Sequence, residues 1–414
     1  MSTQLSNMLS KALPFLRGDL QTIDPSLPNL ITLLQSSGAG ECWHKDGCFL
    51  SHLTDVYRIL KLWNAPNSIA LCGLFHSVYS NSYVNLALFD INSDGRETLR
   101  GLIGVEAERL VHLFCIVDRQ TLIHDDIIFK YSDDELVYHL QCSEESVIKV
   151  RETGISNSNE QWRQKLQSIL PAQGIKVKHI KTGEEVHLSR RMVAAFVLMT
   201  MADFSDQYYS FQDELFDNEN GRLEFTGNKF TALWPGDGRP GLWMNSISRM
   251  GAIYNLIVRE ENIFIQETIT QKSQDYNDRD DDLELVIPPV FQYCTKLLDT
   301  EKQKAARDLY WDVMINHNRM ETVEMMLKES CEKNRYVGEP YLVLGQVYVS
   351  TGRFEEAEKV AEEGLRLIME WGSSWDKRMS WEGWIAWGRL ILMNAKNKSW
   401  PKSSWGILNL GLVR

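Results

Sequence analysis

Two stretches in the C-terminal third of the chain match each other at an offset of 34 residues. HNRMETVEMMLKES, residues 317–330, aligns with TGRFEEAEKVAEEG, residues 351–364. The matched pairs are Arg319 with Arg353, Met320 with Phe354, Glu321 with Glu355 and Glu324 with Glu358. This period is typical of units made of two antiparallel helices, which bury their apolar faces only by stacking on neighbours. We therefore expect an α-helical repeat domain at about residues 285–414.

The second unit is similar to tetratricopeptide repeats. The positions that match the packing positions of that repeat are Leu344, Gly345, Tyr348, Gly352, Phe354 and Ala357. Two later positions depart from it, since Ala361 stands where a large aromatic residue is usual and Gly364 replaces an alanine. A further helix is expected at WEGWIAWGRLILMNAK, residues 381–396, after a longer connection. The resemblance implies a surface that binds a partner helix or peptide.

Length and charge restrict the remaining possibilities. With 414 residues the chain exceeds what one hydrophobic core usually organises, so we expect at least two domains. The net charge of -12 argues against a nucleic-acid partner, because phosphate backbones are bound by clustered Lys and Arg. The sequence has no run of about 18 apolar residues, so no membrane span is expected. Seven cysteines at irregular spacings predict reduced thiols, and hence a cytoplasmic or, less favoured, a plastid-like location.

Two successive apolar helices carry the first candidate site residues. A helix is expected from about Leu50 to Trp63, with His52 at the entrance of its buried face. Ser68 is expected to cap the next helix, IALCGLFHSVYS, which is apolar nearly all round and carries His76 in its middle. A buried imidazole is costly unless it is paired, so His76 must be hydrogen-bonded in the core or bind a metal.

The chain then returns to helices and one hairpin. One amphipathic helix is expected over residues 96–116, then a loop with His124, and another helix from about Asp133. The alternating stretch at residues 175–189 predicts a β-hairpin about a Thr-Gly turn. Ser189 should cap a long apolar helix that carries Asp203 and Asp206 on one side.

A loop-rich connection should follow this first domain. Residues 217–243 are dense in Gly, Asn and Pro, and residues 273–284 form a strongly acidic stretch that is expected to be a solvated loop. One or two helices are expected between and after them, at about residues 244–259 and 289–298. The predicted domains are therefore residues 1–225, a connection at 226–284 and the repeats from residue 285.

His52, His76 and Asp203 form a pattern that resembles the HD-domain superfamily of metal-dependent enzymes. In that superfamily helices supply a His, a His-Asp pair and a distant Asp, and the resemblance covers about residues 27–216. It implies a mainly α domain with a small β-hairpin and a bound divalent transition metal, either iron, manganese or zinc. Here Ser77 follows His76 where the family has Asp, a residue that commonly bridges two metals.

The departure at Ser77 leaves the rest of the site open. His44 or His124 could complete a mononuclear site, or the three residues could be a hydrogen-bonded core group without metal. A zinc knuckle at Cys42, His44 and Cys48 is disfavoured, because no second pair of ligands follows at the required spacing. Arg119 is expected to make a surface salt bridge, with pairing to an anionic substrate as the alternative.

Two functions follow from these residues. The first is a metal-dependent HD-like enzyme that acts on a small molecule, by phosphoester hydrolysis or by iron-dependent oxygenation. The alternative is a non-catalytic scaffold whose degenerate HD-like domain is structural and whose repeats bind a protein partner.

The stretches HSVYSNSY, ADFSDQ and WDKRMSWEGWIAWGR also resemble a largely uncharacterised plant family that joins an HD-like domain to tetratricopeptide-type helices. No phosphate-binding loop, dinucleotide-binding glycine motif, GxSxG or HExxH motif occurs in the sequence.

Overall fold

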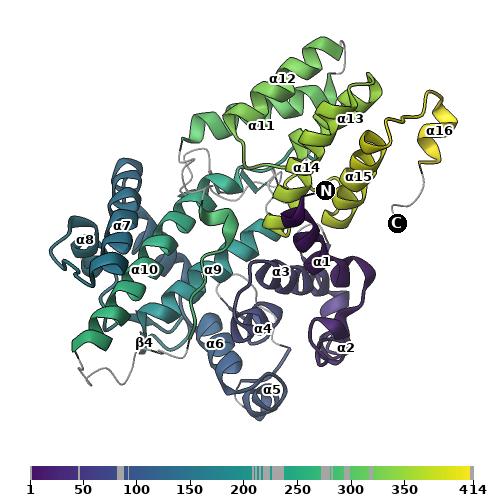
Figure 1. Ribbon diagram of the computed structural model, residues 1–414. Helices are drawn as coiled ribbons and strands as arrows, with labels where there is room; N and C mark the ends of the chain where they lie inside the picture. The colour runs from purple at the N-terminus through teal and green to yellow at the C-terminus, as the bar shows by residue number, and fades with distance from the viewer. Residues whose placement is uncertain are drawn as a thin grey trace. The chain divides into compact units, whose positions relative to one another are not determined.

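The computed structural model describes residues 2–44, 47–81, 88–91, 93–207, 209, 212–213, 216–217, 224–225, 237–271, 280, 283–292, 299–316 and 320–410. The chain is mainly α-helical, as the sequence predicts (Figure 1). The α-helices of the described residues are α1 (Thr3–Arg17), α2 (Leu27–Ser36), α3 (Phe49–Leu62), α4 (Asn67–Phe75), α5 (Gly95–Ile103), α6 (Val105–Ile116), α7 (Asp133–Thr153), α8 (Gln161–Ile169), α9 (Arg190–Gln207), α10 (Trp243–Gln271), α11 (Thr300–Ile315), α12 (Met320–Lys333), α13 (Glu339–Ser350), α14 (Phe354–Trp371), α15 (Trp381–Lys396) and α16 (Ser404–Leu408). Shorter helical turns are η1 (Leu20–Thr22), η2 (Ala39–Glu41), η3 (Thr121–Asp125), η4 (Ile128–Lys130) and η7 (Pro289–Gln292).

The chain forms two compact units, each assembled from segments that are not consecutive. Unit 1 comprises Met1–Pro28, Ser205–Asn245 and Asp299–Arg414, and unit 2 comprises Asn29–Phe204 and Ser246–Leu298. The consecutive domains predicted from the sequence stay a prediction.

Unit 2 is built around the apolar helices α3, α4, α6 and α9. α3 packs on α4, and α4 packs on α6. Gly73 in the middle of α4 allows the first contact, because an added Cβ there would clash with Leu60 Cδ1 and lie 3.2 Å from Val56 Cγ1. The side chains of Leu60 and Val56 are fully buried. The missing side chain of Gly73 therefore sets how closely the two helices approach each other.

Buried ion pairs hold the start of α9 against α10. Arg190 and Arg191, the first two residues of α9, both pair with Glu261 of α10, at 3.3 and 3.0 Å. Arg163 of α8 pairs with Glu260 of α10 at 2.7 Å. All five side chains are buried, and buried charges of this kind are tolerated because each has an opposite charge beside it. The sequence analysis did not identify this network.

Several predicted helix boundaries of unit 2 are wrong. α4 begins at Asn67 with Pro66 at the N-cap, so Ser68 is not the cap, and it ends at Phe75. The helix expected over residues 96–116 is two helices, because Gly104 has a φ of 87° that no regular helix continues through. The loop expected around His124 contains η3, a single turn of π-helix. Helix α7 begins at Asp133 as predicted, where Ser132 and Glu135 form a capping box.

The strands form antiparallel pairs. β3 (Ile175–Lys178) pairs with β4 (Glu185–Leu188), and Ser189 Oγ accepts a hydrogen bond from the first turn of α9, so the predicted hairpin and the predicted cap are both confirmed. β1 (Trp43–His44) pairs with β2 (Gly47–Cys48) just before α3. β5 (Phe216–Asp217) pairs with β6 (Glu224–Phe225).

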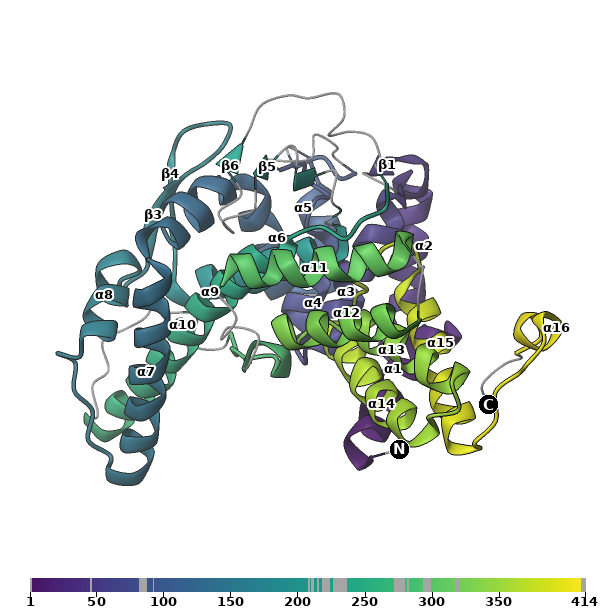
Figure 2. The ribbon, with the colours of Figure 1, turned by 90° about the horizontal axis from the view of Figure 1, so that it is seen from above.

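Unit 1 contains the helix pairs of the C-terminal third. α11 packs on α12, α13 on α14, and α14 on α15, as Figure 2 shows. α12 begins at Met320 and α14 at Phe354, the two positions that the repeat alignment equates. Gly364 of α14 is explained by this packing, since an added Cβ would lie 2.8 Å from Leu342 Cδ2 and 2.9 Å from the carbonyl oxygen of Gly338. The predicted helix at residues 381–396 is confirmed as α15.

Some predictions fall mainly outside the described residues. These are most of the loop at 217–243, most of the acidic stretch at 273–284 and the second half of the helix expected at 289–298, of which η7 covers the start. The helix expected at residues 244–259 is confirmed as part of the longer α10. Among the described helices, none has an apolar stretch long enough to cross a membrane.

Candidate metal centre

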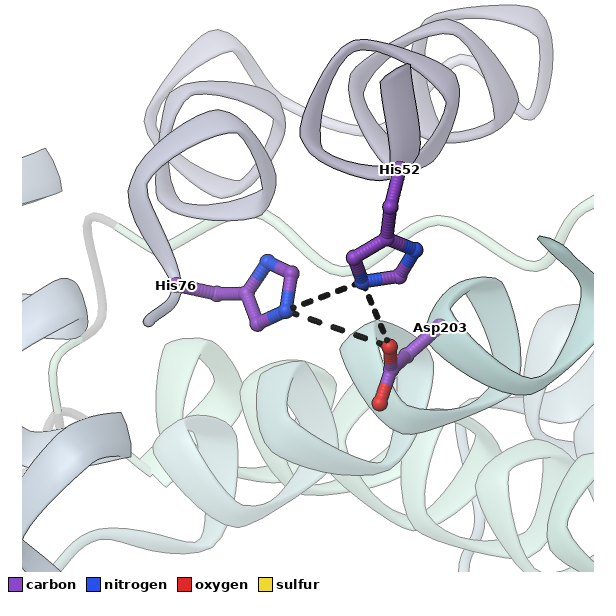
Figure 3. A group of neighbouring side chains, drawn as sticks. All are labelled: His52, His76 and Asp203. Atoms are coloured by element: carbon purple, nitrogen blue, oxygen red, sulfur yellow. Dashed lines mark hydrogen bonds and ion pairs between the residues drawn. The ribbon is translucent and has the colours of Figure 1, made fainter. Parts of the chain in front are cut away.

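Three helices of unit 2 bring His52, His76 and Asp203 together (Figure 3). The Nε2 atom of His52 lies 3.1 Å from Asp203 Oδ1 and 3.4 Å from His76 Nε2. His76 Nε2 lies 3.8 Å from the same Asp203 oxygen. All three residues are buried, and one ligand atom from each lies within 4.8 Å of the others. This group could hold a metal ion.

The separations can be compared with those of a real metal site. Ligand atoms bound at about 2.0 Å to a tetrahedral ion lie about 3.3 Å from one another. The measured separations of 3.1, 3.4 and 3.8 Å lie around this value. The three side chains therefore stand near the spacing that a small divalent ion requires.

The orientation of His76 follows from its place at the end of α4. His76 is the C-cap residue, so its ring can turn back toward the last turn of the helix, where its Nδ1 atom lies 2.7 Å from the carbonyl oxygen of Gly73. A carbonyl oxygen only accepts hydrogen bonds, so Nδ1 carries the proton and donates it. In the neutral ring the lone pair then lies on Nε2, which faces His52 and Asp203. This is the arrangement by which backbone carbonyls orient histidine ligands.

The position of His52 follows from the hairpin before α3. β1 and β2 end at Cys48, which is the N-cap residue of α3, and His52 lies in the first turns of the helix. Its ring meets the ring of His76 edge-on, with centroids 5.2 Å apart. The close contact between α3 and α4 depends on the missing Cβ of Gly73, and this contact brings His52 near His76. The carbonyl oxygen of Gly73 also accepts the hydrogen bond that orients His76.

Burial decides the charge of His76. Burial lowers the pKa of His76 to about 3, although the negative charge of Asp203 raises it, and His52 lowers it further. His76 is therefore neutral at ordinary pH. Its Nε2 lone pair, the Nε2 atom of His52 and a carboxylate oxygen all converge on one small volume. Such a group requires either a shared proton or a cation to offset the repulsion between lone pairs.

His44 and His124 were the other two predicted ligands, and neither belongs to the group. The ring of His44 in β1 lies 4.7 Å from that of His52. The ring of His124 in η3 lies parallel to that of Phe204, 6.2 Å away. Among the described residues, His52, His76 and Asp203 form the one group of possible metal ligands, and the other His and Cys candidates are not part of it. Asp206, half-buried one turn after Asp203, also lies outside it.

Ser77 follows His76, at the position where the resemblance to HD domains leads one to expect Asp. Its side chain is fully buried, and its Oγ atom accepts a hydrogen bond from the Asn81 amide at 2.7 Å. The hydroxyl group is thus used in a local contact between residues four apart. Neither Ser77 nor Asn81 offers a carboxylate to the centre.

Two residues of this region were missed or misjudged in the sequence. Gly73 gave only the weak signal of a glycine inside an apolar helix, which usually has a packing reason. Arg119 was expected on the surface, but only 2% of it is exposed, and its guanidinium carbon lies 3.8 Å from the centroid of the Phe114 ring. The expected surface salt bridge of Arg119 is therefore wrong.

Comparisons with known proteins add one partial match. A family model described as "Domain of unknown function (DUF6817)" matches residues 33–119. This segment contains His52, His76 and Ser77, whereas Asp203 lies outside it. The comparisons with curated proteins and with solved structures found no match.

Proposed function

We propose that this protein is a metal-dependent enzyme with an HD-like domain, and that His52, His76 and Asp203 hold its metal. The observation that carries the proposal is the convergence of two imidazole nitrogens and one carboxylate oxygen in a buried volume. We favour the enzyme over the scaffold alternative, because the three atoms lie near the spacing that ligands take around a small divalent ion.

The donor set narrows the choice of metal. Two imidazoles and one carboxylate suit iron, manganese or zinc, and they leave coordination positions for water and substrate. A bound divalent ion would supply Lewis acidity for hydrolysis of a phosphoester, or redox chemistry for oxygenation if it is iron. His44, whose ring lies beside His52, is the candidate for a further ligand.

Ser77 favours a single ion. In HD domains the carboxylate at this position commonly bridges two metals, and here a hydroxyl bound to Asn81 takes its place. A neutral hydroxyl neither offsets the charge of a second cation nor bridges it well. We therefore propose one metal per chain, acting on a small molecule.

The C-terminal helices are proposed to be tetratricopeptide-like. The support is the pairing of α11 with α12 and of α13 with α14, together with the start of α12 and α14 at positions 34 residues apart. Gly364, which departs from the repeat pattern, lies at a close contact with α13.

Metal analysis of the full chain, purified without a histidine tag, tests the proposed function. We expect about one equivalent of iron, manganese or zinc per chain, and its loss in His76→Ala. His187→Ala is the matched control, because His187 is exposed on β4, where its Nε2 atom donates a hydrogen bond to the carbonyl oxygen of Gln173. A substoichiometric metal content that is equal in the natural protein and both variants would refute the proposal of a metal-dependent enzyme and leave the scaffold alternative.

A further inference from the structure

The segment between α6 and α7 brings two basic side chains into the interior of unit 2. They are Arg119 and His124, of which 2% and 1% are exposed. Each contacts an aromatic residue. Arg119 lies over Phe114, whose ring meets the ring of His76, and His124 lies beside Phe204, the residue that follows Asp203.

His124 has an unused polar atom in this buried position. None of the described residues forms a hydrogen bond with its Nε2 atom. Its ring lies nearly parallel to that of Phe204, with an interplanar angle of 16° and centroids 6.2 Å apart. Almost all buried polar atoms in proteins are paired, so an unpaired one indicates a missing ligand or water. Its position in a single π-helical turn is also typical of functional sites.

Arg119 places a permanent positive charge beside the same centre. Its guanidinium carbon lies 3.8 Å from the Phe114 ring centroid, and that ring meets the ring of His76 edge-on at 6.0 Å. Arginine stays protonated when buried, and its planar fork of N–H donors fits phosphate and carboxylate groups.

We propose that Arg119 and His124 bind the substrate beside the metal, and that this substrate is a small molecule with an oxyanion, either a phosphate or a carboxylate. Arg119 binds the oxyanion, and His124 Nε2 forms a hydrogen bond with a polar group of the same molecule. A buried guanidinium binds an anion more strongly than an exposed one does, because water does not screen the charges. This inference rests on the proposed function for its metal, and it adds the chemical class of the substrate.

The test uses the full chain loaded with Mn²⁺ and two probes, inorganic phosphate and ¹³C-formate. Bound Mn²⁺ is paramagnetic, so a probe that binds beside it shows faster ³¹P or ¹³C nuclear relaxation. We expect saturable relaxation of at least one probe in the natural protein, and the probe that responds identifies the oxyanion. Arg119→Met should weaken this binding at least tenfold, and Arg119→Lys, which keeps the charge, should retain part of it. His124→Phe should weaken it less, with Mn²⁺ affinity unchanged in all three variants.

Arg151→Met, at an exposed position in the last turn of α7, is the matched control and should bind the probes as the natural protein does. If Mn²⁺ binds but the relaxation is the same in Arg119→Met, or if neither probe responds, the inference is wrong while the metal centre stands. If no Mn²⁺ binds, the proposed function fails. In that case a thermal shift by phosphate or formate, present in the natural protein and absent in Arg119→Met and Arg119→Lys, would still support the anion site, and its absence would refute it.

Discussion

His76 donates a hydrogen bond from Nδ1 to the carbonyl oxygen of Gly73 at 2.7 Å, and this bond directs its Nε2 atom toward His52 and Asp203. The same glycine lets α3 approach α4, because its missing Cβ leaves room for Leu60. One residue without a side chain thus sets both the orientation of one candidate ligand and the distance to another.

We predict that Gly73→Ala damages the centre although it alters none of the candidate ligands. The added Cβ clashes with Leu60 Cδ1, so either the Leu60 side chain or α3 as a whole must shift, at a cost of about 1–3 kcal/mol. The urea midpoint, measured by circular dichroism, should fall, and metal analysis should show that metal affinity falls with it. Gly101→Ala in α5 is the control, because an added Cβ there meets nothing within 4 Å, and alanine should stabilise that helix slightly. Unchanged stability in Gly73→Ala would show that the helices do not need this close contact.

We predict that Ser77→Ala keeps the metal. The substitution removes the hydroxyl group that accepts from the Asn81 amide, so we expect a loss of about 1 kcal/mol in the free energy of unfolding. Because the hydroxyl group is not proposed as a ligand, the metal content per chain should equal that of the natural protein. Metal analysis and urea unfolding check the two parts separately. A loss of metal in Ser77→Ala with retained structure would make Ser77 a ligand.

The buried ion pairs lead to a prediction about the helix that carries Asp203. Glu261 pairs with Arg190 and Arg191 at the start of α9, and all three are buried. Glu261→Gln leaves two buried guanidinium groups without this carboxylate, and removal of one partner of a buried pair costs about 3 kcal/mol or more. Urea unfolding should show this loss. Glu145→Gln, at an exposed position on α7, should change stability by less than about 0.5 kcal/mol. An equal effect of the two substitutions would contradict a structural role for the network.

The sequence was sufficient for those parts of the site that depend on residue type and periodicity. His52, His76 and Asp203 could be selected because histidines in apolar helices and a distant aspartate suit a metal. The hairpin before α9 could be predicted because alternation and a Thr-Gly turn are local signals. Ser189 could be predicted as the cap of α9 for the same reason.

Other features depend on contacts between distant residues, and for this reason the sequence did not predict them. Nothing local to Arg119 indicates that it is buried against Phe114, and nothing local to Arg190 identifies Glu261 as its partner. The break at Gly104 was missed because the apolar spacing continues across it, while its φ of 87° ends the helix. The end of α4 at Phe75 was missed because the residues that follow are also buried.

The last prediction concerns Glu339, the first residue of α13. Burial raises the pKa of this carboxyl group to about 7, while the backbone N–H groups of Trp375 and Asp376, at 2.6 and 3.3 Å, lower it, and the charge of Asp376 raises it. The folded chain therefore binds a proton more tightly than the unfolded chain, whose glutamate has its ordinary pKa of about 4.3. The contribution of Glu339 to stability is fully present below the unfolded pKa and is lost as the pH rises toward 7. Glu339→Gln keeps a neutral acceptor for the two N–H groups and does not titrate, so the variant should match the natural protein at about pH 4.5 and exceed its stability at pH 8, by about 3 kcal/mol at most. Urea midpoints at the two pH values measure this difference, and a difference between the proteins that does not change with pH would show that folding does not shift the pKa of Glu339.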